Sequence, residues 1–111
     1  MNISFTEFLK VDIRKGTIID AILFDGAIKP AIKIWIDFGF DIGVKKSSAQ
    51  ILDLYSPKNI LGKSILAVVN LPPRQIGSFM SEVLVLGLED KNQSIVLITP
   101  EAHVPNGSKL K

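Results

Sequence analysis

Apolar and polar residues alternate strictly along residues 31–40, and this is the clearest regularity in the chain. The apolar positions are Ile32, Ile34, Ile36, Phe38 and Phe40, and the positions between them are Lys33, Trp35, Asp37 and Gly39. A period of two in β-branched and aromatic residues is typical of a strand with one face in the core and the other turned toward water or a ligand. We therefore predict a strand over residues 31–40.

Five other segments have the composition of short strands and are separated by turn residues. They cover residues 11–23, 44–46, 65–71, 83–86 and 95–98. Gly16 lies in the middle of the first segment. A glycine there predicts a bulge or a sharp coil, which lets a strand bend around the corner of a barrel.

Two short helices are predicted from capping patterns. Ser4 and Glu7 fit a capping box, and Phe5, Phe8 and Leu9 recur at helical spacing, so an N-terminal helix should lay one apolar stripe on the body. Residues 47–50 repeat the capping pattern, and the apolar positions Ile51, Leu54 and Tyr55 follow at the spacing of one helical face. We therefore expect a second helix between the third and fourth strands.

A helix between the third and fourth of five or six short strands is the order of elements in an OB-fold. We predict an all-β chain that forms one domain over residues 1–111, a five-stranded Greek-key barrel. Such barrels bind oligonucleotides or oligosaccharides on the face of strands two and three and on the adjoining loops. An SH3-like barrel or a small sandwich is the structural alternative, and the helix after the third strand argues against both.

The composition also predicts a second subunit. Hydrophobic residues make up 47% of the 111 residues, and the mean hydropathy is +0.33, which is more apolar surface than one small core readily hides. Large hydrophobic subunit interfaces are the usual outlet for such a surplus, so we predict a homodimer. The net charge of +2 and the pI near 9.0 permit nucleic-acid binding without requiring it.

The residue types present also limit the compartment. The chain has no cysteine, which excludes disulfides and thiolate metal sites and fits a reducing compartment. The first residues lack the pattern of a signal peptide, and no apolar run approaches the roughly 18 residues of a membrane span. We expect a soluble, cytoplasmic protein without membrane insertion.

The inventory of chemical groups argues against catalysis. His103 is the only histidine and lies in a proline-rich tail, while Asp37 and Asp41 flank a tight turn that they are expected to cap or solubilise. The chain contains no glycine-rich phosphate loop and no serine nucleophile elbow. We therefore expect no enzyme activity, no cofactor and no metal site.

The connection over residues 70–82 is the strongest candidate for a binding site. Pro72 and Pro73 cannot donate to a sheet ladder, so they end the preceding strand and stiffen the chain beyond it. Several polar side chains then stand between two apolar strands: Arg74, Gln75, Ser78, Ser81 and Glu82. Polar groups on a loop held by a rigid scaffold often form binding sites, and an ordinary strand connection facing water is the alternative.

Five motifs occur in order along nearly the whole chain. They are VDIRKGTI (11–18), IGVKKSSAQ (42–50), NLPPR (70–74), SFMSEVLVLG (78–87) and VPNG (104–107). With these motifs the chain resembles the tRNA-binding-domain family, and within it the stand-alone bacterial CsaA group. The same family includes the C-terminal appendix of many methionyl-tRNA synthetases.

The resemblance implies a homodimeric OB-fold in which residues 95–111 form much of the dimer contact. It also implies two alternative functions. One is the binding of tRNA by shape, without catalysis. The other is chaperoning of preproteins on the export route, with association with the translocation ATPase. The family's ligand-facing positions correspond here to Lys33, Lys45, Lys46, Ser47, Ser48, Asn70, Arg74, Ser78, Ser81 and Glu82.

For RNA, these side chains have defined physical roles. Arg74 can bind a phosphate through two hydrogen bonds, and the lysines act as point charges. Trp35 or Phe79 can stack on an unpaired base. Lysines at strand ends also protect sheet edges, and Lys45 and Lys46 fit either interpretation.

For a preprotein, the same face would hold an extended, partly apolar and positively charged segment. Ile76, Phe79 and Met80 would supply adaptable apolar contacts, although Met80 can equally be core. Glu82 can accept a hydrogen bond from either ligand, or it can pair with Arg74 and fix the loop. The two functions differ in salt dependence, since phosphate binding weakens steeply as salt rises.

Overall fold

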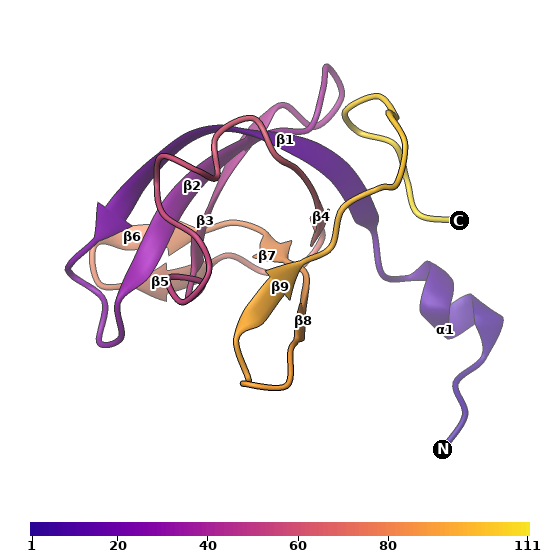
Figure 1. The fold of residues 1–111 in the computed structure, drawn as a ribbon. Coiled ribbons are helices and arrows are strands. Elements are labelled where there is room, and N and C mark those ends of the chain that lie inside the picture. Colours follow the sequence, from indigo (N-terminus) through magenta and orange to yellow (C-terminus); the bar gives the residue numbers. More distant parts are fainter.

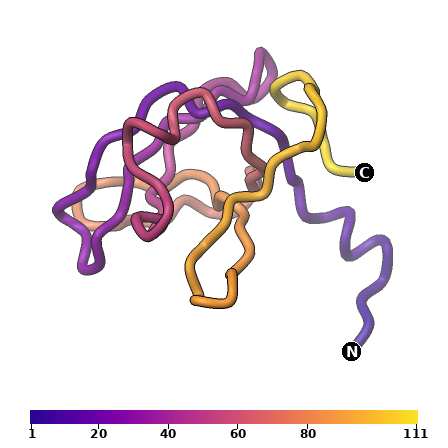
Figure 2. The backbone as a smooth tube through the Cα atoms, viewed as in Figure 1, coloured from indigo at the N-terminus to yellow at the C-terminus, as the bar shows by residue number.

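In the computed structural model, which describes residues 1–111, one long strand, β1 (Ile13–Phe24), holds the main sheet together (Figure 1). The first half of β1 pairs with β4 (Ser64–Val68), and its second half pairs with β2 (Ala31–Asp37). β3 (Val44–Ala49) and β7 (Leu84–Val85) complete the order β3-β2-β1-β4-β7, and every pairing is antiparallel. The sheet curls into a half-barrel, which confirms an all-β, OB-like fold (Figure 2).

The apolar positions of the alternating pattern form the core. Ile32, Ile34, Ile36 and Phe38 are completely buried, and they pack with Ile18, Ile51, Ile60 and Ile65. Phe40 is an exception and is fully exposed. The strand ends at Asp37, and Gly39 then takes a φ of +88°, which turns the chain before Phe40. The prediction of a strand as far as residue 40 is therefore wrong at its end.

Gly16 serves close packing, and the bulge lies three residues further along β1. A Cβ on Gly16 would lie 2.5 Å from Cγ2 of Ile36 and 2.8 Å from Cδ1 of Phe38. No side chain fits there, so glycine lets β1 cross closely over the core. The register between β1 and β2 shifts between Ile18 and Asp20, where the strand bends.

The predicted helix between the third and fourth strands is not formed. Ser47 and Ser48, which were expected to cap it, belong to β3 and pair with β2. Because sheet pairing satisfies their backbone groups, the capping pattern is not used. Residues 50–63 form turns instead, and one turn is closed by the amide of Tyr55, which donates to the carbonyl of Ile51 at 3.1 Å.

The predicted loop at residues 70–82 contains a small hairpin. Its strands are β5 (Arg74–Ile76) and β6 (Phe79–Ser81), joined through Gly77 at a φ of +58°. The predicted strand at residues 83–86 is reduced to the two residues of β7. A second hairpin follows, formed by β8 (Gly87–Glu89) and β9 (Ile95–Leu97).

The C-terminal segment lies along the start of β1. The amide of Lys15 donates to the carbonyl of Ser108, and the amide of Leu110 donates to the carbonyl of Ile13, both at 2.9 Å. The Lys15 side chain is only 4% exposed, and its Nζ donates to Oδ1 of Asn106 at 2.8 Å. This segment therefore occupies an edge of β1 that no other strand covers.

The N-terminal helix, α1 (Phe5–Leu9), forms as predicted but stands away from the sheet (Figure 1). The amide of Glu7 donates to Oγ of Ser4 at 3.1 Å, and the amide of Ser4 donates to Oε1 of Glu7 at 3.0 Å, which confirms the capping box. No residue of α1 is buried, so the expected packing of its apolar stripe on the body is wrong. No helix of the protein is long and apolar enough to cross a membrane.

Candidate nucleic-acid interface and adjoining groove

Two of the predicted lysines share the outer face of β2 and β3. Lys33 and Trp35 alternate with the buried isoleucines of β2, so they point away from the core. Their cross-strand partners on β3 are Ser48 and Lys46, and directly paired residues lie on the same face of a sheet. The four side chains therefore line one surface, which we call the cation face.

The ring of Phe79, on β6, covers part of the cation face. It lies 5.6 Å from the ring of Phe24 and 6.1 Å from that of Trp35, measured between centroids, and it is only 6% exposed. Nζ of Lys33 lies 4.5 Å from the Phe24 centroid and 5.2 Å from the Phe79 centroid, and Nζ of Lys46 lies 5.4 Å from the Phe79 centroid. Because the ring is buried, the prediction that Phe79 stacks on a base is wrong.

The cations of this region have no carboxylate partners. The single ion pair in the protein joins Arg14 to Asp12, far along β1 from the cation face. Lys33, Lys46 and Arg74 form no ion pair, and Glu82 does not pair with Arg74 as one alternative proposed. An uncompensated group of cations attracts anions.

The side chains of three predicted site residues connect β3 to the end of β6 and to the residues that follow it. Oε1 of Glu82 accepts a hydrogen bond from the amide of Lys46 at 3.1 Å, and the Glu82 amide donates to the Lys46 carbonyl at 2.8 Å. Oγ of Ser81 accepts from the amide of Ser48 at 3.2 Å. The buried hydroxyl of Ser47 donates to the carbonyl of Val83 at 2.9 Å. These groups close the outer edge of β3.

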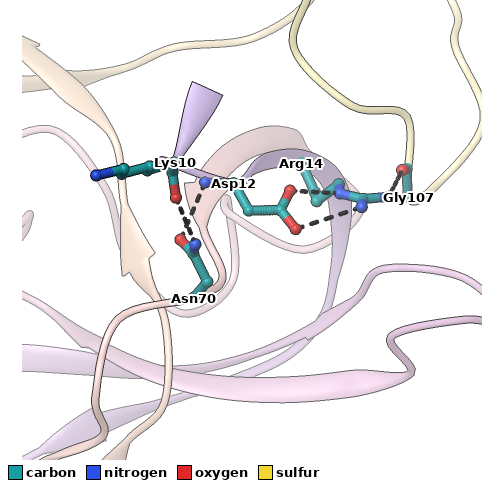
Figure 3. Close-up of polar contacts among 5 residues, drawn as sticks. All are labelled: Lys10, Asp12, Arg14, Asn70 and Gly107. Carbon is teal, nitrogen blue, oxygen red and sulfur yellow. Dashed lines mark hydrogen bonds and ion pairs between the residues drawn. The ribbon is translucent and has the colours of Figure 1, made fainter. Parts of the chain in front are cut away.

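Asn70, which follows β4, holds the segment that leads into β1 (Figure 3). Its Oδ1 accepts from the amide of Asp12 at 2.9 Å, and its Nδ2 donates to the carbonyl of Lys10 at 2.7 Å. Asp12 also holds Arg14, whose Nη1 donates to the carbonyl of Gly107 at 3.0 Å. The hydrogen bond to Asp12 raises the pKa of the Arg14 guanidinium above its ordinary value, so this cation stays charged.

Two further predicted residues, Lys45 and Ser78, lie outside the cation face. Lys45 pairs with Ile36, so it lies on the other face of β3 from Lys46. Ser78 is exposed at the turn of the β5–β6 hairpin, and its side chain makes no hydrogen bond within the protein.

A groove of about 680 Å³ adjoins the cation face and is mostly apolar. Its lining includes Ile28, Ile51, Ile76, Leu84, Leu86, Ile95 and Leu97. Lys29 and Arg74 are the only charged residues in this lining. Arg74 therefore faces the groove, and the groove meets the cation face at Ser48.

Two contributors to this region were not predicted from the sequence. Phe24 ends β1 and holds Lys33, but an aromatic residue before a turn carries no local sign of that contact. Lys29 lies in the turn before β2, and only its charge could have suggested a role. Both depend on how the β5–β6 hairpin folds back toward the turn between β1 and β2.

The comparisons with known proteins agree with this fold. Residues 13–109 match the family described as "Putative tRNA binding domain". The chain is 44% identical to the chaperone CsaA of Bacillus anthracis, with a TM-score of 0.93 and 100% of each chain covered. It is 46% identical to the CsaA chaperone protein of Picrophilus torridus, with a TM-score of 0.92, covering 99% of this chain and 100% of that one.

A third relative is much longer than this chain. It is the methionine–tRNA ligase of Parabacteroides distasonis, which is 33% identical over 112 residues. The match covers 99% of this chain but 16% of the ligase. The family match extends from β1 to the C-terminal segment that closes it, and the neighbouring structures superpose over the whole fold. The chain therefore belongs to the tRNA-binding-domain family.

Proposed function

We propose that this chain is a non-catalytic module that binds tRNA through the cation face and the adjoining β5–β6 hairpin. The observation that carries this proposal is that Lys33, Lys46 and Arg74 lie around one face without carboxylate partners. A phosphate backbone supplies the missing negative charges, and each contact releases condensed counterions. Membership of the family makes tRNA the first ligand to test.

Of the other polar side chains, some can contact the RNA and others support the surface that binds it. The hydroxyls of Ser48 and Ser78 make no hydrogen bond within the protein and can bond to phosphate or 2′-hydroxyl oxygens. Lys45 lies on the other face of β3 and is not part of the proposed contact. The predicted residues Ser47, Asn70, Ser81 and Glu82 support the surface, because their side chains already bond to the backbone. Trp35 is the ring on this face that can stack on an unpaired base, since it is only half-buried.

Titration of the protein with bulk tRNA at two salt concentrations tests this function. We expect micromolar or tighter binding at low salt that weakens as salt rises. Arg74→Ala should weaken it about 3- to 10-fold, since it removes a charged phosphate contact. Lys63→Ala removes the same charge from a turn outside the cation face and should change the affinity less than about twofold. Absence of binding to the unaltered protein at low salt would reject the proposal.

A second function, the binding of extended preprotein segments, is supported by the apolar groove beside the cation face. Pockets lined by apolar side chains with a few polar groups commonly hold ligands. Two solved structures similar to this chain carry the name chaperone. Association with the translocation ATPase would accompany this function, as the resemblance to the CsaA group implies.

A labelled, unfolded preprotein segment tests the second function. Ile76→Ser changes the groove lining, whereas Met80→Ser changes an exposed residue of the same hairpin outside it. Salt-insensitive binding that is weakened by Ile76→Ser and retained in Met80→Ser would support preprotein binding. Equal effects of the two substitutions would argue against the groove as its site.

We further propose that the module acts as a homodimer in the cytoplasm. Phe5 on α1 is 72% exposed, and Leu88 on β8 is 67% exposed beside its exposed cross-strand partner Val96. An apolar helix and an apolar hairpin that face water are the usual signature of a subunit interface. The region from residue 95 onward contributes to this surface through Val96 and Leu110.

A further inference from the structure

We propose that Phe79 is a positioning residue whose ring holds the ammonium groups of Lys33 and Lys46 as a preformed pair for one stretch of phosphate backbone. This inference rests on the proposed tRNA function and adds the subsite that would meet the RNA. It also changes the role of Phe79 from a stacking surface to a support beneath the cations.

The geometry around the ring carries the proposal. Nζ of Lys33 and Nζ of Lys46 lie 5.2 Å and 5.4 Å from the Phe79 centroid, so both ammonium groups contact the same ring. Phe24 gives Lys33 a second ring at 4.5 Å. Ammonium groups within about 6 Å of a ring centroid are attracted by the electrons of the ring face. The ring thus attracts both ammonium groups and restrains where each of them lies.

The ring itself is held firmly. Phe79 is 6% exposed, and it packs with Phe24, Ala31 and Ile76 in a small cluster separate from the main core. Lysine side chains are long and flexible, and ordering them on a ligand costs conformational entropy. A rigid ring that already restrains both lysines reduces this cost. Binding of a polyanion is then stronger than two free lysines would allow.

The hairpin connects this pair to the third cation. Ile76 pairs with Phe79, and Arg74 pairs with Ser81 on the same two strands. Correct placement of the ring and of Arg74 therefore depends on one small element. All three cations are also free of carboxylates, so nothing within the protein competes with a phosphate for them.

The test measures tRNA affinity as a function of salt for the unaltered protein, Phe79→Leu and Phe79→Tyr. Phe79→Leu keeps an apolar side chain but removes the ring, and we expect about 3- to 10-fold weaker binding with a shallower salt dependence, the slope falling by about one contact. Phe79→Tyr retains the ring and should restore both values. Affinity and slope equal to the unaltered protein in Phe79→Leu would overturn the inference.

An NMR measurement on the unaltered protein tests the positioning role of Phe79 even if Phe79→Leu does not fold. Protons near the face of an aromatic ring are shifted upfield in NMR spectra. The ε-methylene protons of Lys46, whose Nζ lies over the Phe79 ring alone, should therefore resonate upfield of those of Lys63, whose Nζ lies over no ring. Unshifted resonances would reject the positioning role. Failure of the unaltered protein to bind tRNA would instead reject the proposed function itself.

Discussion

Asn70 matches a ligand-facing position of the family, yet its side chain is used within the fold. Its amide oxygen accepts from Asp12 and its amide nitrogen donates to Lys10, so it fastens the start of β1 to the end of β4 (Figure 3). A side-chain amide has two N–H donors and an oxygen acceptor, and this clamp occupies one donor and the oxygen. The first residue of the motif NLPPR therefore serves the architecture, and ligand binding is proposed for its last residue, Arg74.

We expect Asn70→Ala to lower the free energy of unfolding by about 0.5–1.5 kcal/mol, because it removes two hydrogen bonds to the backbone that water replaces only in part. Urea denaturation measures this loss. Asn92→Ala is the matched control, because its side chain makes no hydrogen bond within the protein, and it should be near neutral. The tRNA affinity of folded Asn70→Ala should change less than about twofold. A large loss of affinity with full stability would show that Asn70 contacts the ligand directly.

The pattern of apolar and polar residues predicted which side chains are buried only where that pattern repeats along the chain. Period-two alternation identified Ile32, Ile34 and Ile36, because strand periodicity is a local property. The burial of Phe79 could not be predicted in this way, since it depends on Phe24 on a distant strand. Lys33, Lys46 and Phe79 were named as candidates from the sequence, but Phe24 and the contacts of the lysines with the two rings were not.

Among the elements, β3 shows why local patterns can point to the wrong structure. Residues 47–50 fit a helix cap, but the same residues complete the pairing of β3 with β2 as far as Ala49. Tertiary pairing overrode a local preference. The β5–β6 hairpin was missed for a related reason, because paired prolines and a single glycine indicated a loop. Gly77 at its turn was the available signal.

The edge of β3 gives an element-scale prediction. Glu82→Ala removes the acceptor for the Lys46 amide, and we expect a loss of about 1–2 kcal/mol in unfolding free energy. Glu82→Gln retains an oxygen at that position and should lose less. Thermal denaturation of the two variants measures the difference. Equal stability of both would show that this hydrogen bond contributes nothing.

The capping box of α1 gives a prediction for acid pH. Hydrogen bonds from the Ser4 backbone and side chain hold the pKa of Glu7 below its ordinary value of 4.5. A carboxylate with a lowered pKa stabilises the folded form above its unfolded value and loses that effect as the pH falls through its folded value. The protection of the α1 amides, measured as the exchange rate relative to the intrinsic rate at each pH, should therefore fall below about pH 4.5. Glu7→Gln should abolish this pH dependence, and an unchanged profile would exclude the cap as its cause.

At the scale of the whole molecule, α1 and the β8–β9 hairpin present apolar surface that the monomer leaves uncovered (Figure 1). Composition predicted such a surplus, although the sequence did not indicate that α1 leaves the body. Amphipathic spacing shows that a helix has an apolar face without showing which surface receives it. The choice between packing on the same chain and packing on a second copy is set by tertiary structure.

We expect Phe5→Glu to shift the protein from dimer to monomer in sedimentation analysis, because it places a charge on the exposed face of α1. Ile28→Glu is the control, since Ile28 is also apolar and exposed but lies in the turn between β1 and β2, at the opposite end from α1 (Figure 1). Dissociation by both substitutions, or by neither, would contradict an interface built on α1.

The closure of β1 by the C-terminal segment has a consequence for synthesis at the ribosome. The carbonyl of Ile13 accepts a hydrogen bond from the amide of Leu110, and the buried ammonium of Lys15 donates one to Asn106. Both partners are synthesised about 90 residues after β1 begins. Contacts between distant parts of a chain form late and slowly. A nascent chain that has emerged as far as β9 therefore holds β1 with one edge open. We expect the native state to form only after residues 106–110 have left the exit tunnel.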